Sequence, residues 1–298
     1  MKKHCSHLLQ LLILSLVIIS CNNNAPGNMD EDDTASVQTS DQAPNTPATW
    51  NMGIGLYSFN LFPFSVSLDK ADSAGVKFVE GFSFHALKGA FKDSTMANLS
   101  SHGIMNMKRM LDEKGIKMRS MYVAGGKDAE EWKRYFEMAK TLGMEFLVCE
   151  PKKEHWDLLD SLGEIYNVKI AIHEHAKGSS AYWHPDSVLA AIKGHKNIGA
   201  CADLGHWTRS GLDAVKCLNQ LKGHILGVHL KDVSKAETEG EDVIVGKGLI
   251  DFAGVTRELK AQNFTGLVYM ECEHKMDNNL PDIIESIQYF NSIAAGAK

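Results

Sequence analysis

The feature that most constrains the fold is a pair of apolar strands that end on metal-binding side chains. Residues 197–233 have the pattern of a strand, a loop, a helix and a second strand. The first strand stops at Asp203, with His206 just beyond it, and the second contains His229 and is followed by Lys231. Polar groups at the carboxyl ends of buried strands are what a (βα)8 barrel enzyme needs, because its active site lies at that end.

The rest of the chain repeats this alternation from residue 51 onward. Strands are predicted at 52–57, 76–79, 116–123, 144–149, 168–172, 197–202, 225–230 and 267–270. Helical patterns, several of them ended by a glycine, are predicted at 66–74, 104–114, 128–142, 154–166, 185–193 and 282–295. A doubly wound open sheet also alternates, but Gly53-Ile-Gly55 and Gly246-Lys-Gly248 do not provide its glycine-rich phosphate turn. We therefore predict an α/β fold, a (βα)8 TIM barrel over residues 50–298.

The amino terminus is predicted to lie outside the barrel. Residues 1–20 begin with lysines and continue in an apolar run that is too short for a membrane span, as in a secretory signal. The run ends at Cys21 in the manner of a bacterial lipoprotein signal; an ordinary signal peptide with a chance cysteine is the alternative. Residues 21–49 hold prolines and an acidic run, which predicts a disordered linker. We expect an exported protein, anchored in the cell envelope (periplasmic or outer-membrane) only by lipid on Cys21.

Composition narrows the function classes. The chain is 44% hydrophobic and 23% charged, as in ordinary globular proteins, and its net charge of -6 argues against a nucleic-acid partner. Its six cysteines form no C-x-x-C pair, so no zinc knuckle or redox motif is predicted. We interpret Cys149, Cys201, Cys217 and Cys272 as small buried hydrophobes, with a chance disulfide as the alternative.

Strand alternation predicts which polar side chains share one face of the sheet. Near five strand ends the residues expected on the inner face are Glu150, His173, His175, Asp203, His229, Lys231, Glu271 and Glu273. Without a cation such a cluster would repel itself and would be costly to desolvate. A divalent ion would neutralise the carboxylates and use the imidazoles as ligands. Each residue alone could equally be a satisfied strand-end group, and Lys231 with Asp232 a plain surface pair; the repetition favours a metal site.

Three motifs resemble those of the xylose isomerase-like barrel superfamily, the sugar isomerases and epimerases related to tagatose epimerase and inosose dehydratase. They are DLGHW at 203–207, GVHLKD at 227–232 and YME at 269–271, and the resemblance covers roughly residues 51–290. It implies a divalent metal, commonly manganese, bound by Glu, Asp, His and Glu on strands five to eight. The last three carry over to Asp203, His229 and Glu271.

The first ligand of that set does not carry over directly. Where relatives have Leu-Glu-Asn-His, this chain has Ile-His-Glu-His at 172–175, so the ligand position falls on His173. Glu150, one strand earlier, is the other candidate to complete the site, as a ligand or as a base. A histidine ligand makes the site less negative and would favour zinc, cobalt or nickel.

The resemblance also implies a reaction, proton removal next to a carbonyl that the metal polarises. Relatives use two carboxylates for this exchange; here Glu271 fits one role, and His173 or His175 could be the base instead. One-sided abstraction followed by β-elimination, as in barrel relatives that cleave 3-keto-glycosides, is the alternative to isomerisation or epimerisation. His206 and Lys231 are candidate substrate or proton-transfer groups.

The predicted partner is a small carbohydrate without phosphate, because sugar phosphates are not expected outside the cytoplasm. Trp207 is the candidate platform for a sugar ring, and Arg209 a candidate substrate contact. Two other classes of protein are alternatives. A DNA-repair endonuclease with a zinc cluster on the same barrel is disfavoured by export, by charge and by too few further ligands. A non-catalytic sugar-binding lipoprotein is the second alternative. A homo-oligomer is a further possible assembly.

Overall fold

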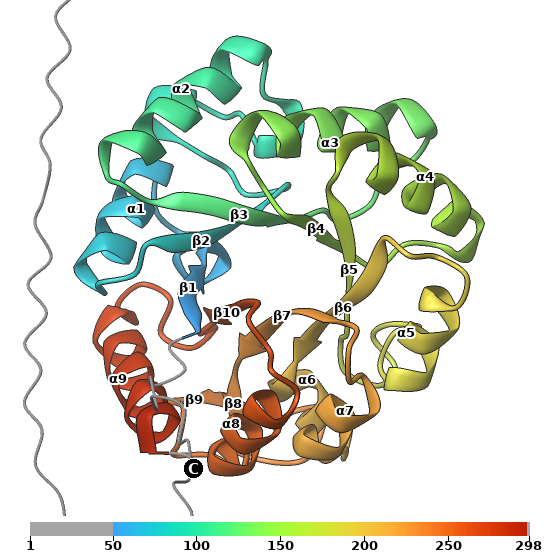
Figure 1. The fold of residues 1–298 in the computed structure, drawn as a ribbon. Coiled ribbons are helices and arrows are strands. Elements are labelled where there is room, and N and C mark those ends of the chain that lie inside the picture. The colour runs from blue at the N-terminus through green and yellow to red at the C-terminus, as the bar shows by residue number, and fades with distance from the viewer. Residues whose placement is uncertain (1–49, 297–298) are drawn as a thin grey trace, which may run out of the picture. The chain divides into compact units, whose positions relative to one another are not determined.

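Eight parallel strands close into a barrel, which Figure 1 shows at the centre of a ring of helices. The computed structural model describes residues 50–296. The strands are β1 (Asn51–Gly55), β2 (Phe78–Phe82), β3 (Lys117–Tyr122), β4 (Phe146–Cys149), β5 (Lys169–His173), β6 (Ile198–Asp203), β7 (Ile225–Leu230) and β10 (Leu267–Met270). Neighbours pair in parallel, and β1 closes the ring against β10. The predicted (βα)8 TIM barrel is confirmed.

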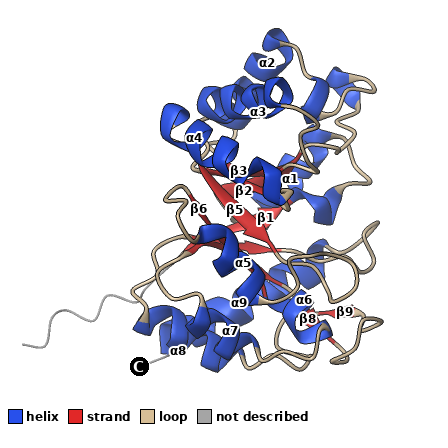
Figure 2. Ribbon diagram, turned by 90° about the vertical axis from the view of Figure 1, so that its right-hand side faces the viewer, coloured by secondary structure: helices blue, strands red, loops and turns tan. Residues whose placement is uncertain are grey.

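Helices cover the outside of the barrel, as the side view in Figure 2 shows. They are α1 (Phe64–Ser73), α2 (Ser101–Glu113), α3 (Ala129–Leu142), α4 (Trp156–Tyr166), α5 (Pro185–Ile192), α6 (Leu204–Arg209), α7 (Ala214–Gln220), α8 (Phe252–Ala261) and α9 (Leu280–Gly296). A short hairpin, β8 (Asp232–Val233) with β9 (Asp242–Val243), follows β7. Within residues 50–296 no helix is both long and apolar enough to span a membrane.

Helix α3 illustrates how local sequence signals set these elements. Asp128 caps its start by accepting a hydrogen bond from the Glu131 amide at 2.9 Å, and Gly143 ends it with a φ of +74°. Such a left-handed residue after the last turn favours glycine, which has no Cβ. Trp132 and Phe136, one helical turn apart, are buried against the strands. The predicted amphipathic helix is therefore confirmed.

Two apolar cores hold the barrel together. The larger one lies between the strands and the helices, and the smaller one fills the barrel with Phe146, Val148, Ala171, Cys201, Leu267 and Tyr269. They lie on the same strand faces as the polar strand-end residues that strand alternation predicted to point inward. Gly227 on β7 makes room for Phe146, because a Cβ there would lie 3.0 Å from its ring. The inner face continues into the polar residues at the carboxyl ends.

The structure corrects the predicted secondary structure in two regions, one directly after β6 and one between β7 and β10. The stretch behind Asp203, predicted as a loop, is the helix α6, and α8 and the β8–β9 hairpin had no predicted counterpart.

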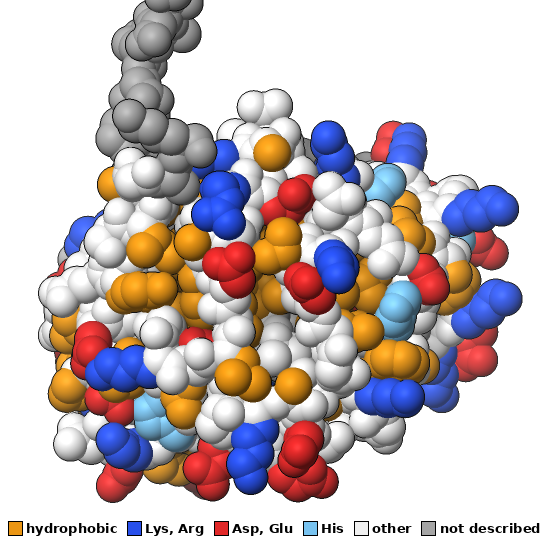
Figure 3. Space-filling view, turned by 90° about the horizontal axis from the view of Figure 1, so that it is seen from below, with side chains coloured by type: hydrophobic (Ala, Val, Ile, Leu, Met, Phe, Trp, Pro, Cys, Tyr) orange, Lys and Arg blue, Asp and Glu red, His pale blue; other side chains and the backbone are white. Residues whose placement is uncertain are grey.

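The four cysteines at 149, 201, 217 and 272 are buried and unpaired. The predicted signal at 1–20, the linker at 21–49 and Cys21 lie outside the described residues. On the face seen in Figure 3, acidic and basic side chains are interspersed, without a basic stripe.

Candidate metal centre and active site

Four side chains converge at the carboxyl-terminal mouth of the barrel. His173, Asp203, His229 and Glu271 each offer one ligand atom, and these atoms lie within 4.8 Å of one another. Asp203 Oδ2 is 3.5 Å from His173 Nε2 and 3.7 Å from His229 Nδ1. His229 Nδ1 is 3.1 Å from Glu271 Oε2. All four residues are at most 5% exposed. We call this group the four-residue cage.

The cage has the properties of a divalent metal site. Asp203 Oδ2 and His229 Nδ1 are buried atoms with no hydrogen-bond partner, although buried polar atoms are normally paired. They lie 3.7 Å apart, and the first is 3.5 Å from His173 Nε2 and the second 3.1 Å from Glu271 Oε2, so both lie among the four side chains. Two imidazole nitrogens and two carboxylate oxygens are a donor set that suits divalent transition metals. The residues present therefore fit such an ion, with His173 rather than Glu150 in the cage.

Glu150 and His175 form a hydrogen-bonded pair beside the cage, which we call the dyad. Glu150 Oε1 is bonded to His175 Nδ1 and accepts the Tyr122 hydroxyl at 3.0 Å. His173 Nδ1 lies 3.8 Å from the same oxygen, so these three residues form a second group with ligand spacing. Burial acts to raise the pKa of Glu150, but hydrogen bonds from His173 and His175 outweigh it and hold the pKa well below its usual range. Glu150 is therefore ionised at neutral pH.

Lys231 supplies a buried positive charge. Its Nζ lies 3.4 Å from Glu271 Oε2 and 3.6 Å from Asp203 Oδ2, and it is paired with Glu273. Burial acts to lower the pKa of the ammonium group, but the carboxylates of Glu271, Asp203 and Glu273 raise it well above its usual value. Gly205 gives the lysine stem room, since a Cβ there would lie 2.8 Å from Lys231 Cγ. Lys231 is a charged donor and not a base.

His206 lies at the edge of the cage. Asp203 caps α6 with its other oxygen, which accepts the His206 amide at 2.8 Å, and this places the His206 Nε2 4.0 Å from Asp203 Oδ2. Its ring centroid is 4.6 Å from that of His175. Burial, the largest cause, lowers the pKa of His206 well below its usual value, so the ring is neutral.

The cage opens into a pocket of about 320 Å³ with two unlike halves. The polar half is lined by His173, His175, His206, His229, Lys231, Glu271 and Glu273. The other half, which we call the aromatic wall, consists of Tyr57, Phe82, Phe84 and Tyr122. Phe82 stacks on Tyr122 with centroids 5.6 Å apart, and Phe84 meets both rings edge-on. Phe84 is 46% exposed, which is unusual for a phenylalanine held among other rings.

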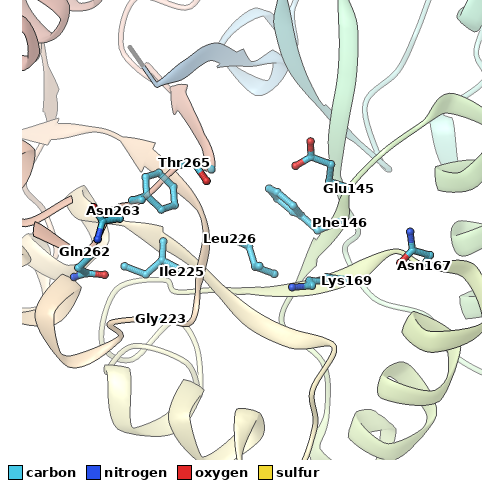
Figure 4. A pocket seen from close by; sticks show the side chains of 12 residues that line it. Glu145, Phe146, Asn167, Lys169, Gly223, Ile225, Leu226, Gln262, Asn263 and Thr265 are labelled. Atoms are coloured by element: carbon cyan, nitrogen blue, oxygen red, sulfur yellow. The ribbon is translucent and has the colours of Figure 1, made fainter. Parts of the chain in front are cut away.

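A second hollow, of about 500 Å³, lies at the other end of the barrel (Figure 4). It is lined by the first residues of three strands, Phe146, Lys169 and Ile225. Glu145 is the one carboxylate among the described residues that line it, and none of them is a histidine. The titratable cluster thus belongs to the carboxyl-terminal mouth, the end at which barrel enzymes carry their active sites.

Two predicted substrate contacts lie elsewhere. Trp207 has no exposed surface and belongs to the core between strands and helices, so its prediction as a sugar platform is wrong. Arg209 is not among the residues that line the pocket. Its guanidinium is paired with Asp242 and donates to the Gly240 carbonyl at 2.8 Å, which ties α6 to the β8–β9 hairpin. Lys231 and Asp232 are both 1% exposed, so they are not a surface pair.

Sequence reasoning missed the aromatic wall and Glu80. Glu80 has no exposed surface and points into the barrel, where it contacts His229 and Ser120. A signal existed in β2, because the sequence Phe78-Val-Glu80-Gly-Phe82 places a carboxylate between two aromatics on one strand face.

Comparisons with known proteins agree with this architecture. The family described as xylose isomerase-like TIM barrel matches residues 68–293. Inosose dehydratase from Clostridium beijerinckii is 27% identical over 156 residues, which cover 44% of this chain and 52% of the relative. The chain thus spans about half the length of the curated relatives it matches.

Solved structures extend the likeness over most of the barrel. An uncharacterized protein from Parabacteroides distasonis is 31% identical, with a TM-score of 0.65, and the alignment covers 80% of this chain and 97% of that one. The IOLI protein, solved with a bound zinc atom, is 18% identical with a TM-score of 0.69, covering 83% and 99% of the two chains. The second likeness is one of fold.

Proposed function

The chain belongs to the xylose isomerase-like TIM barrel family, and on that premise we propose that it is a metal-dependent carbohydrate enzyme that removes a proton next to a carbonyl group. One observation carries the proposal. The four-residue cage and the dyad of Glu150 and His175 lie beside one another at the same mouth of the barrel, and His173 contacts both. A Lewis-acid site next to an oriented base is the arrangement that this proton transfer requires.

The pocket favours a neutral carbohydrate. Among the described residues that line it, Lys231 is the one lysine or arginine, and it is already paired with Glu271 and Glu273. A phosphate group bound here would lie beside these carboxylates, and the one cationic side chain that lines the pocket is already paired with them. The repulsion between like charges therefore disfavours a phosphorylated substrate. The aromatic wall supports the same reading, because exposed rings such as Phe84 pack against the apolar face of a sugar ring.

The residues divide the chemistry between them. A divalent ion held by the four-residue cage would polarise the carbonyl oxygen and so ease the loss of the neighbouring proton. His175 is the base that we assign. Glu150 holds Nδ1, which orients the ring, leaves Nε2 as the proton acceptor and stabilises the imidazolium that forms. The Lys231 ammonium donates to a substrate oxygen on which negative charge develops.

This division favours elimination over epimerisation. An epimerase needs a proton acceptor for each face of the reacting carbon, and relatives use two carboxylates. Here His173 stands at one of these two carboxylate positions and lies in the cage, and Lys231, which also lines the pocket, is held protonated and cannot accept a proton. A base combined with a charged donor suits removal of a proton and departure of a leaving group from the adjacent carbon. The partial likeness to proteins named inosose dehydratase supports this reading.

The test uses the full chain, loaded with zinc or manganese, in D2O. A 3-keto-glycoside and a free ketose are supplied separately, and aglycone release and deuterium incorporation are measured. We expect aglycone release that a chelator abolishes and that His175→Gln lowers by about 100-fold. His102→Gln, on the exposed face of α2, is the matched control and should have no effect.

The outcomes separate the functional alternatives. Deuterium exchange into the ketose without aglycone release would assign isomerisation or epimerisation to the same site. A protein that binds carbohydrate, holds no metal and is indifferent to the chelator would overturn the proposal in favour of a non-catalytic binding protein.

A further inference from the structure

We propose that Glu80 is a positioning residue for the metal site, which fixes the tautomer and the ring orientation of His229. Glu80 lies on β2 and His229 on β7, and β1 and β10 stand between these strands in the barrel. Glu80 Oε1 and His229 Nε2 are 2.9 Å apart, and the two residues are 0% and 1% exposed. The contact therefore spans the barrel interior and connects a ligand of the cage to a residue that is not in it.

Hydrogen-bond chemistry assigns the direction of this contact. A carboxylate only accepts, so the proton must lie on His229 Nε2. The neutral ring then carries its lone pair on Nδ1, the atom that has no hydrogen-bond partner and faces Asp203 and Glu271. In the other tautomer a proton would point into the cage and a lone pair would face the carboxylate. Glu80 thus selects the tautomer that can bind a cation.

Glu80 is itself held in place. Its second oxygen accepts the Ser120 hydroxyl at 2.6 Å, and Ser120 Oγ is also 2.9 Å from the Tyr269 hydroxyl oxygen. A serine has a single hydroxyl proton, which goes to the carboxylate, so Tyr269 donates to Ser120. Gly53 leaves room for the tyrosine, because a Cβ there would lie 2.8 Å from its ring. The chain Tyr269–Ser120–Glu80–His229 is a buried relay behind the cage.

The relay explains why a carboxylate lies in an otherwise apolar part of the barrel interior. Burying a charged group is costly unless it has a charged or strongly polar partner. Glu80 lies between Phe78 and Phe82 on one face of its strand. An apolar side chain at position 80 would pack there without the cost of burying a charge. Carboxylates that receive the second N–H of a ligating histidine raise its basicity and hold its ring, and their loss typically weakens metal binding 10- to 100-fold.

The test measures binding of Zn²⁺ alone to the full chain, by competition with a chromophoric chelator. Glu80→Gln keeps the shape but removes the charge, and we expect an affinity for zinc that is lower by about 10- to 100-fold. Tyr269→Phe removes the outermost hydroxyl of the relay and is the graded control, with an expected loss of about threefold or less. Zinc affinity is read without any substrate, so failure of the proposed reaction would not affect the result.

A second measurement is made on the wild-type protein, so it does not depend on whether a variant folds. Long-range ¹H–¹⁵N spectra of the zinc-loaded protein assign the tautomer of His229, and we expect a ligated Nδ1 and a protonated Nε2. In the zinc competition experiment, a Glu80→Gln protein that is less stable but binds zinc with unchanged affinity would show a purely structural role and would overturn the proposal. Ligation through Nε2 would overturn it as well.

Discussion

His173 changes the charge of the proposed metal site. With two neutral imidazoles and the carboxylates of Asp203 and Glu271, the ligands of the four-residue cage balance the charge of a divalent ion. The family resemblance implies a third carboxylate at the place of His173, which would make the site negative overall. Nitrogen ligands raise the preference for zinc, cobalt and nickel over manganese. The identity of one residue thus bears on metal choice.

The substitution His173→Glu should move that preference. We expect the ratio of bound zinc to bound manganese, after loading with equal amounts of both, to fall by about tenfold, because a hard oxygen replaces an imidazole nitrogen. Elemental analysis of the desalted protein measures the ratio. The exposed His102→Glu is the control and should leave it unchanged. An unaltered ratio in folded His173→Glu protein would place this residue outside the metal's ligands.

For single residues, the sequence predicts the strand face on which a side chain lies better than it predicts the residue that the side chain contacts. Strand alternation was sufficient to predict that His173, Asp203, His229 and Glu271 lie at one mouth of the barrel. The side-chain period of two determines the face of the strand on which each one lies. It did not identify Glu80, whose role depends on a contact with a residue 149 positions away. Nothing near Glu80 in the sequence specifies which strand lies across the barrel from it.

Among the elements, α6 accounts for the wrong prediction at Trp207. The strand period of two holds as far as Asp203, whose side chain then caps a helix. From the cap onward successive side chains turn by the helical period of 3.6 residues, so His206 stays beside the cage while Trp207 turns into the outer core. A short helix of this kind carries too few residues to show its own apolar period, and for that reason it was predicted as a loop.

The loop between β9 and α8 depends on Asp232. This buried carboxylate accepts four backbone N–H groups at 2.8 to 3.2 Å, those of Val233, Gly246, Gly248 and Ile250. Asp232→Ala should destabilise the protein by about 2–4 kcal/mol, because these donors lose their acceptor in a buried loop. Urea unfolding measures the loss.

The matched control is Asp251→Ala, which removes the cap of α8 and should cost about 1 kcal/mol. Equal costs for the two substitutions would show that Asp232 acts as one ordinary capping group and does not organise the loop.

His195 joins α5 to α4 in a pH-dependent way. Its Nδ1 contacts the Ala191 carbonyl at 2.6 Å and its Nε2 contacts Asp157 at 3.0 Å, so both nitrogens meet acceptors and the ring is stabilised as an imidazolium. The hydrogen bond to Asp157 is the largest cause that raises the pKa of His195. Because the folded pKa is the higher one, the added stability is fully present below the unfolded pKa and is lost as pH rises through the folded pKa.

We therefore expect Asp157→Asn to reduce the free energy of unfolding at about pH 5.5 and to have little effect near pH 8.5, on either side of the ordinary imidazole range. Urea unfolding at the two pH values gives the difference between wild type and variant, which cancels the contributions of other groups. A difference that grows toward alkaline pH would have the wrong sign and would refute the assignment.

For the whole molecule, the order of the elements was the most predictable property. Most of the predicted strands are followed by a helical segment, and closed or doubly wound parallel sheets satisfy that alternation. The loops were not predictable in the same way. The aromatic wall joins segments far apart in the chain, and the β8–β9 hairpin is held against α6 by Arg209. Register shows that Asn51 pairs with Leu267 at the starts of β1 and β10, so the chain enters the barrel at the end opposite the pocket.

We also propose, from the sequence alone, that a lipid anchor is attached at Cys21. Stable membrane attachment takes more than one acyl chain, as a bacterial lipoprotein cysteine provides. Full-length protein made in a bacterium with labelled palmitate should carry the label and partition into Triton X-114, and Cys21→Ser should lose both properties while the barrel stays folded. Cys5→Ser, which lies in the predicted signal, is the control and should keep both. Labelled, detergent-partitioning Cys21→Ser protein would show that attachment uses another residue.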